Sequence, residues 1–363
     1  MNLALKHANA LPAPTWLRLG VNDTNIEETI PELFPYNGEP LVSGLPEGVA
    51  APETADMPEM ETGMGAEAAE FCLSHRTAGV DLRIPAGVRV QEPVFLSYRL
   101  DEKNPGVADV NTVTAEENSE VTVVLRYESD AETAGFHGGL TRLYAAKGAV
   151  IRLVQVQMLG DRCLHFDNVG ALLEEGARVD LVQAELGAKH ALSGFQAFLK
   201  GKHSALNIDT IYFGDRSRNL DINYVARHAG RKTHSEIHVS GALLDESGKT
   251  FRGTIDFLKG AAQAVGHESE YNLLFSPKVR NRTAPLILCA EEDVEGQHAA
   301  STGKIDENRL FYLMSRGLSE LEAKKLVIES QFRPVTDKIP DPALRDAVSD
   351  YVKARLDTIE PIS

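Results

Sequence analysis

A succession of short alternating segments fills the middle of the chain and restricts its fold more than any other feature. From about Gly79 to Leu288 these segments are rich in β-branched residues, and Gly, Asp, Asn and Lys separate them: VDLRIPAGVRV, EVTVVLRY, AVIRLVQVQML, ARVDLVQAEL, ALNIDTIYF, LDINYV and HSEIHVSGALL. Alternation places successive side chains on opposite faces of a sheet, so each segment is predicted to be a strand. The chain is therefore predicted to be mainly β.

A weak internal repeat indicates how these strands are arranged. The segment Gly148–Val154 resembles Gly176–Val182, and further turn glycines follow at Gly201 and Gly230. These intervals lie in the range of about 20–50 residues that is typical of solenoid turns. Stacked strands of this kind bury a continuous core by pairing with their neighbours, which favours a β-helix or β-solenoid. A two-sheet sandwich is the alternative.

The flanks of the strand region differ from it in composition, which predicts three parts. Residues 1–75 are expected to form a mixed region that contains a Pro- and Glu-rich linker over 31–61 and a short helix over 65–75. Residues 76–300 are expected to form the β-helix core, and residues 301–363 a helical domain.

Helix signals in the last part are clear. Asp306 is suited to cap a first helix, and Ser319 with Glu322 forms a capping box for a second, which Pro334 is expected to end. A last helix is predicted to begin at Pro342, whose fixed φ suits a first helical position. The first two helices carry an aromatic and aliphatic face that a compact domain would not need, which suggests a docking surface.

Charge and composition exclude several classes of function. The chain has 53 acidic and 37 basic residues and a formal net charge of -16, which argues against a nucleic-acid partner. No apolar run approaches the roughly 20 residues of a membrane span, and the N-terminus has no signal-peptide pattern, so a cytoplasmic protein is expected. The three cysteines, Cys72, Cys163 and Cys289, lie far apart and form no CxxC pair, which gives no sign of a zinc site or disulfide framework.

Three local patterns suggest chemistry but have simpler interpretations. The segment 246–250 resembles the end of a phosphate-binding loop, but Leu243 occupies the position of a required glycine, so a hairpin turn between strands is favoured. His234 and His238 share one strand face with Glu236, where they could hold a divalent metal, although a solvated polar face is the favoured interpretation. Cys289 ends an apolar run and is expected to be an inert buried thiol.

His298 is a further candidate. Small residues flank it (Gly296, Ala299 and Ala300), and it is expected at the junction between the last strand and the first helix. A neutral imidazole there could ligate iron or carry a proton. The local sequence by itself favours a surface or capping histidine.

The same region carries a resemblance to a known family. The residues concerned are His298-Ala299-Ala300-Ser301, Gly303, Leu310-Phe311-Tyr312-Leu313-Met314-Ser315-Arg316-Gly317 and Glu322-Ala323, with Arg280–Thr283 and Leu11–Leu19 in support. This pattern resembles the SufB/SufD family of iron–sulfur cluster assembly proteins, and SufD more than SufB. The CGAH-type segment of SufB is missing before His298, which argues against the SufB identity.

The resemblance implies a fold and a set of partners. It implies a right-handed parallel β-helix between a small N-terminal region and a C-terminal helical domain. It also implies a non-catalytic scaffold subunit that pairs with a SufB-like paralogue and a SufC-like ABC ATPase to build and transfer nascent iron–sulfur clusters. The C-terminal helices would dock the ATPase, through residues Leu310, Phe311, Tyr312, Leu313, Arg316 and Leu326.

The resemblance also implies a role for His298 at the interface with the paralogue, where the cluster would form. No cysteine adjoins His298, so a cluster would need ligands from the partner, and no cofactor or metal is expected on the chain alone unless His234 and His238 hold one. Flavin binding and a homodimer of the isolated chain stay open. The alternative function is that of a β-helix carbohydrate-active enzyme, which would be expected to have a leader peptide and a groove lined with carboxylates and aromatic residues.

Overall fold

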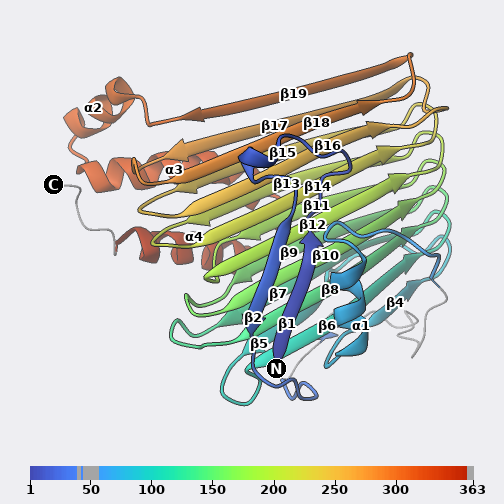
Figure 1. Ribbon diagram of the computed structural model, residues 1–363, viewed down its shortest axis with the longest axis horizontal. Helices are drawn as coiled ribbons and strands as arrows, with labels where there is room; N and C mark the ends of the chain where they lie inside the picture. Colours follow the sequence, from blue (N-terminus) through green and yellow to red (C-terminus); the bar gives the residue numbers. More distant parts are fainter. Residues whose placement is uncertain (39–41, 44–56, 358–363) are drawn as a thin grey trace.

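Two stacked sheets form the body of the molecule in the computed structural model, which describes residues 1–38, 42–43 and 57–357 (Figure 1). Consecutive strands alternate between the sheets. Within the described residues, the first sheet has eight strands, in the order β18-β16-β14-β12-β10-β8-β6-β4, and the second has nine, in the order β19-β17-β15-β13-β11-β9-β7-β5-β3. Apart from the antiparallel β3–β5 pair, neighbours within both sheets are parallel. The predicted parallel β-solenoid is confirmed, and the sandwich is wrong.

The strands of each sheet recur at similar intervals along the chain, so the turns of the solenoid have similar lengths. The eight-stranded sheet comprises β4 (Asp81–Ile84), β6 (Gly106–Ala115), β8 (Phe136–Ala145), β10 (Leu164–Leu173), β12 (His190–Leu199), β14 (Asn219–His228), β16 (Gly248–Phe257) and β18 (Arg280–Cys289). The nine-stranded sheet comprises β3 (Val42–Ser43), β5 (Val94–Leu100), β7 (Glu120–Ser129), β9 (Val150–Met158), β11 (Arg178–Glu185), β13 (Ala205–Gly214), β15 (His234–Leu243), β17 (Ala264–Leu274) and β19 (Val294–Gly303).

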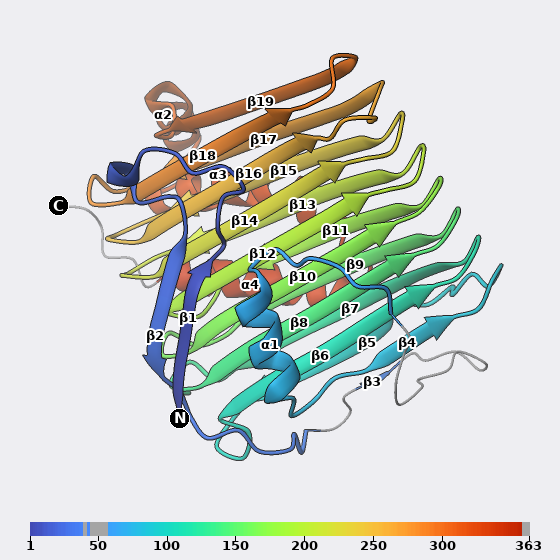
Figure 2. The same cartoon turned by 45° about the vertical axis from the view of Figure 1, so that its right-hand side comes forward.

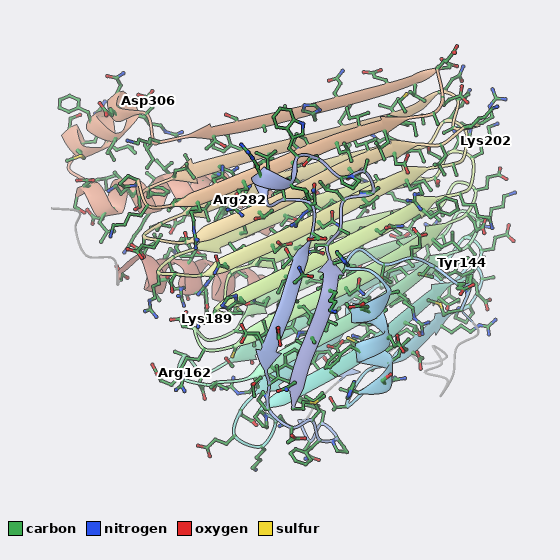
Figure 3. All side chains as sticks on the ribbon, viewed as in Figure 1. Tyr144, Arg162, Lys189, Lys202, Arg282 and Asp306 are labelled. Carbon is green, nitrogen blue, oxygen red and sulfur yellow. The ribbon has the colours of Figure 1, made fainter. Side chains whose placement is uncertain are left out.

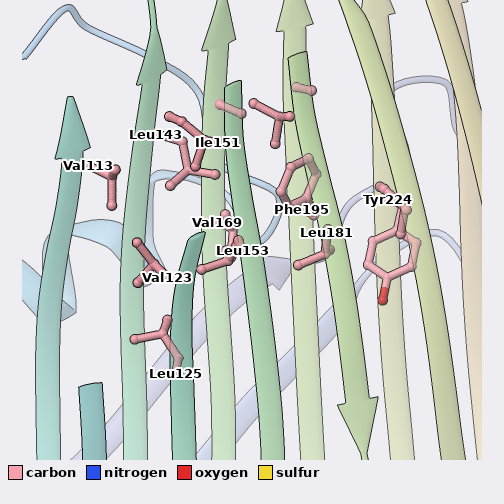
Figure 4. Packing of buried hydrophobic residues seen from close by; sticks show 14 of the residues in the cluster. Val113, Val123, Leu125, Leu143, Ile151, Leu153, Val169, Leu181, Phe195 and Tyr224 are labelled. Atoms are coloured by element: carbon pink, nitrogen blue, oxygen red, sulfur yellow. The ribbon is translucent and has the colours of Figure 1, made fainter. Parts of the chain in front are cut away.

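In-register pairing stacks equivalent side chains into rows that run through the solenoid. Val123 pairs with Leu153, and Leu153 with Leu181, so the three lie in one row of the interior (Figure 4). Side chains alternate between the faces of a strand, so inward rows are apolar and every second row faces outward. Each turn thus adds one layer to the same core, which is why the alternating segments predicted the fold.

Other elements cover the outer faces of both sheets (Figure 2). The antiparallel ribbon of β1 (Asn2–Ala8) and β2 (Thr24–Thr29) packs with helix α1 (Ala66–Ser74) on the eight-stranded sheet, in a cluster that includes Leu3, Cys72 and Phe166. A short 3-10 turn, η1 (Leu17–Leu19), joins β1 to β2. The predicted linker over 31–61 lies partly outside the described residues.

Two of the three C-terminal helices cover the nine-stranded sheet. These are α3 (Glu320–Thr336) and α4 (Pro342–Asp357), whose apolar residues, among them Phe332 and Val348, pack against strand residues such as Phe213. The expected end of α3 at Pro334 is wrong, because the helix continues to Thr336 with Val335 buried against the sheet. The first helix, α2 (Glu307–Ser315), has no buried residue. No helix among the described residues is long and apolar enough to cross a membrane.

Candidate functional site at the open end of the solenoid

The last two strands leave one end of the solenoid uncovered. Strand β18 ends the eight-stranded sheet and β19 ends the nine-stranded sheet, so each pairs on one side only with a described strand. Nearly every residue of β19 is exposed. The free edges present unpaired backbone N–H and C=O groups, which are a template for pairing with another chain.

His298 lies in the middle of β19 and not at the expected strand-to-helix junction. The strand region was predicted to end near Leu288, but the chain turns and forms one more strand through Gly303. The sequence of β19 lacks the apolar alternation of the other strands because no further turn covers it. His298 therefore belongs to the last layer of the solenoid.

The side chain of His298 is on the inward face of β19. A Cβ placed on Gly296 would lie 3.3 Å from Ile287 on β18, across the interior. At the other end of β19, the Asn281 amide donates to Thr302 Oγ1 at 3.1 Å, again between β18 and β19. His298 has the same parity as these two residues of β19 and so faces the interior. It is exposed, since nothing in the described chain lies above it.

Glu268 lies directly beneath His298. It is the register partner of His298 on β17, and its side chain is only 3% exposed. Burial, with the charge of Glu270 as a second cause, raises the pKa of Glu268 to about 8. Its Oε1 has no hydrogen-bond partner within the described residues. A Cβ on Gly253 would lie 2.9 Å from the Glu268 Cδ, so the glycine makes room for this carboxyl group.

A buried ion pair completes this layer. Lys249 Nζ contacts the Glu270 carboxylate, and both side chains are fully buried. The Lys249 ammonium also donates to Thr283 Oγ1 at 3.0 Å, and the Thr283 hydroxyl donates to Glu270 at 2.6 Å. Burial lowers the pKa of Lys249, while Glu270 opposes this shift. The expected hairpin turn over 246–250 is wrong, because the turn connects strands of different sheets and Lys249 lies inside β16.

Together these residues place an accessible imidazole above a nearly buried carboxylic acid. An imidazole nitrogen can bind a transition metal or exchange a proton, and a carboxyl group with a raised pKa can supply one near neutral pH. The described residues contain no group of three or more His, Cys, Asp or Glu side chains arranged to hold a metal ion. The Cys289 thiol at the far end of β18 is exposed rather than buried, because β18 is also in the uncovered layer.

The structure also brings His234 and His238 together, on the outer face of β15. Both lie beside Glu236: His234 Nε2 is 3.0 Å from Glu236 Oε1, and His238 Nε2 is 3.9 Å from Oε2. His267 of the neighbouring strand β17 is hydrogen-bonded to the same carboxylate at 2.9 Å. The arrangement is a partly exposed polar cluster around one carboxylate.

Four of the six residues predicted to dock a partner lie on α2, Arg316 caps the C-terminus of that helix, and Leu326 lies in the first half of α3. Phe311 is 74% exposed and Leu326 is 45% exposed. The Arg316 guanidinium lies 5.3 Å from the centroid of the exposed Tyr312 ring. Leu310 and Leu313 are half-buried. The apolar face of α3 is largely covered by the sheet, but the face of α2 is not, so the uncovered surface centres on α2.

Sequence reasoning named His298 as a candidate but did not consider Glu268, Lys249 or Glu270. A usable signal was present, because Glu268 and Glu270 are spaced by two in a strand and therefore share a face. Recognising that this face is inward requires the register that stacks Glu268 below His298. The weak repeat in the sequence did not supply that register.

Comparison with known proteins now identifies the family. Residues 98–331 match the family model described as "SUF system FeS cluster assembly, SufBD core domain", which covers the solenoid from β5 to the middle of α3. The chain belongs to the SufBD family. Among its relatives is the SufD protein of Bacillus subtilis (strain 168), which is 24% identical over 85% of this chain and 72% of the relative.

Other SufBD relatives match a smaller share of their own length. The SufB protein of the same bacterium is 24% identical over 73% of this chain and 57% of the relative. A SufBD family protein of Mycobacterium leprae (strain TN) is 27% identical over 71% of this chain and 30% of the relative. The chain thus spans between about a third and about three quarters of the length of these SufBD proteins.

Proposed function

We propose that this chain is a SufD-like, non-catalytic scaffold subunit that assembles and transfers iron–sulfur clusters together with a SufB-like paralogue and a SufC-like ABC ATPase in the cytoplasm. The observation that carries the proposal is the inward-facing His298 at an uncovered solenoid end, between two free strand edges. Membership of the SufBD family favours this function over the polysaccharide-cleaving alternative.

The open end fits a partner that is itself a solenoid. Both β18 and β19 are ten residues long and offer their free edges side by side, which suits strand addition from two sheets at once. A partner seated there would cover His298 and close the site above Glu268. In the absence of the paralogue, a second copy of this chain could use the same edges.

His298 would contribute one ligand or proton to a cluster that the partner completes. The inner rows of this layer hold one thiol, Cys289, near the start of β19, whereas His298 is in the middle of that strand. Sulfur ligands next to His298 therefore have to come from the paralogue. Glu268 beneath the imidazole would hold it in place and exchange protons with it.

Replacing His298 with alanine is expected to lower the iron and acid-labile sulfide content of the purified complex about tenfold, the scale seen when one group that supports a metal site is removed. The complex should still assemble, because His298 is exposed and makes no hydrogen bond within the described residues. Metal and sulfide analysis of the co-purified complex measures this. His238→Ala, on the outer face of the same sheet, is the matched control and should leave both contents unchanged. Unchanged iron and sulfide in His298→Ala would remove this residue from the mechanism.

The ATPase is assigned to α2 because that helix presents an aromatic and arginine surface with no cover. Aromatic residues and Arg dominate the residues that contribute most to protein interfaces. Phe311 and Tyr312 of α2 are exposed, and the guanidinium of Arg316, which caps the helix C-terminus, lies over the Tyr312 ring. Helices α3 and α4 fix the position of α2 on the solenoid: Arg355 of α4 pairs with Asp215, and Lys338 after α3 pairs with Asp209 at 2.6 Å.

Changing Phe311 and Leu313 together to aspartate is expected to abolish co-purification of the ATPase. Two charges placed in an apolar contact cost more than about 2 kcal/mol, or more than about thirtyfold in affinity. Folding should persist, because α2 has no buried residue. Affinity purification with both proteins expressed measures the loss. Lys202→Asp, on a solenoid turn remote from α2 (Figure 3), is the control. Retention of the ATPase by the double variant would refute docking at α2.

A further inference from the structure

A groove of about 580 Å³ lies on the outer face of the eight-stranded sheet, beside the N-terminal ribbon. One wall comes from β2, whose Thr24, Ile26 and Glu28 share the face that carries the buried Ile26 toward the sheet. The floor comes from the first residues of β12, β14, β16 and β18. The groove opens on the outward rows of this sheet, so it is separate from the inward-facing His298.

In-register pairing arranges the floor in two rows. The first row is His190, Asn219, Gly248 and Arg280, and the second is Leu192, Asp221, Thr250 and Arg282. Gly248 has no side chain in the first row, and its neighbours pack closely over it: a Cβ there would lie 2.8 Å from Asn219 Oδ1 and 3.7 Å from Arg280 Nε. Asn219 and Arg280, on either side of this glycine, both line the groove.

At the β18 end of the groove floor, two arginine side chains have no acidic partner among the described residues. Arg280 and Arg282 are exposed, and neither lies within 4.0 Å of a carboxylate in the described parts of the chain. The Arg282 guanidinium makes one long hydrogen bond, of 3.4 Å, to the Gly20 carbonyl oxygen (Figure 3 labels Arg282). Asp221 is not available to them, since it accepts from Arg252 at 2.6 Å and from Asn9 at 2.7 Å.

Several other arginines of the solenoid pair with the carboxylates that are abundant in this chain, whose formal net charge is -16. Arg83 pairs with Glu116 at 2.6 Å, and Arg152 with Glu120 at 2.5 Å. Two exposed guanidinium groups without an ion pair within 4.0 Å in the described residues, at one end of the groove, form a site for an anion.

The opposite end of the groove has a different character. His190 is half-buried, and burial lowers its pKa while the nearby Glu28 opposes that shift. A neutral imidazole beside a carboxylate can accept and donate hydrogen bonds, which suits hydroxyl groups of a ligand body. The groove volume lies within the range of about 300–1,000 Å³ that is usual for small-molecule sites.

We propose that this groove binds a small hydroxylated organic anion, with its carboxylate or phosphate group on Arg280 and Arg282 and its body extending over Gly248 toward His190. Arginine guanidinium groups bind both kinds of oxyanion through paired N–H donors. The body of the ligand would meet Asn219 and Thr250 on the floor and Glu28 on the wall.

Calorimetric titration of the isolated full-length chain tests the proposal, with citrate and malate as carboxylates, and ribose 5-phosphate and inorganic phosphate as phosphates. Saturable binding of one probe per chain is expected for at least one series, and the series that binds identifies the anionic group. The double variant Arg280→Gln/Arg282→Gln should bind at least about tenfold more weakly, because hydrogen bonds to charged groups contribute about 1.5–3 kcal/mol. Arg231→Gln, an exposed arginine on a distant turn, is the matched control.

A second variant separates shape from charge. Gly248→Val keeps both guanidinium groups but adds a side chain to the floor and displaces Asn219, so it should also weaken binding of the same probe. Melting curves without ligand show whether each variant is folded. The proposal is overturned if no probe binds saturably, if the double arginine variant binds as the parent does, or if Arg231→Gln loses as much affinity. Pull-downs with the paralogue and the ATPase test the proposed function separately, so failure of one does not imply failure of the other.

Discussion

Replacing Lys249 with methionine is expected to destabilise the protein by about 3–5 kcal/mol, the usual result of removing one partner of a buried ion pair. The Lys249 and Glu270 side chains are both fully buried, one strand below the two edge strands. Methionine keeps most of the volume and the contacts with the rings of Tyr212 and Phe251, which lie 5.8 Å and 5.7 Å from Lys249 Nζ. The loss therefore comes from the Glu270 charge left in the interior.

Urea unfolding followed by circular dichroism measures this loss. The double variant Lys249→Met/Glu270→Gln should recover most of the stability, because the amide oxygen of glutamine can still accept from Thr283 and no charge is left unpaired. Lys278→Met removes an exposed partner of Glu246 and is expected to change little. If Lys249→Met unfolds at the same urea concentration as the parent, the pair does not contribute as the geometry indicates.

The fold could be predicted from the sequence because each turn of the solenoid repeats the same alternation of inward and outward residues. Inward residues such as Val179 and Leu181 are apolar in each turn, so alternation predicts the strands. The register in which successive turns stack was harder to predict from the sequence. A left-handed backbone position recurs at the turns, and it is glycine at Gly148 and Gly176 but Asn118 and His203 in the neighbouring turns. Because several residue types can occupy this position, glycine spacing alone does not define the repeat.

The candidate site could be predicted only in part from the sequence, because it depends on how the turns stack. His298 was singled out through the resemblance of its neighbours to a family motif, whereas Glu268 becomes a candidate only because it lies one turn below His298. The last strand was missed because its inward positions are Val294, Gly296, His298, Ala300 and Thr302, of which only Val294 has an apolar side chain larger than alanine. A terminal strand that no further turn covers buries few side chains. Its sequence therefore lacks the apolar alternation by which the other strands were predicted.

A second buried polar group lies deep in the solenoid, between β6, β8 and β10. His137 Nε2 is 2.5 Å from Asp109 Oδ1, and His137 Nδ1 is 2.8 Å from His165 Nδ1. Burial raises the pKa of Asp109 to about 8 and lowers the pKa of His137 to about 3. Near neutral pH the Asp109 carboxyl is therefore protonated and donates to a neutral imidazole. Burial likewise raises the pKa of Glu185 to about 8.

These shifts predict how stability depends on pH. An unfolded carboxyl group ionises near pH 4, but Asp109 and Glu185 keep their protons in the folded state until about pH 8. The folded state then binds more protons, so its stability falls as pH rises toward 8. His137 acts in the opposite direction, because its unfolded form binds a proton below about pH 6.5 and the folded form does not. Below pH 6.5 the two carboxyl groups and His137 change the free energy of unfolding in opposite directions. Between pH 6.5 and 8 the change comes from the two carboxyl groups and no longer from His137.

The free energy of unfolding is therefore expected to decrease between about pH 6.5 and 8, by about 1.4 kcal/mol per pH unit for each buried carboxyl group that stays protonated. Asp109→Asn should reduce this slope by about one such contribution, because an amide mimics the protonated acid: its nitrogen can donate to His137 and its oxygen can accept from Asn111. Urea unfolding at a series of pH values gives both slopes, and Asp130→Asn at an exposed position should leave the slope of the parent unchanged. A stability that rises from pH 6.5 to 8, or an equal slope in Asp109→Asn, would mean that the buried carboxyl groups are ionised in the folded protein and that the Asp109–His137 contact is a charged pair.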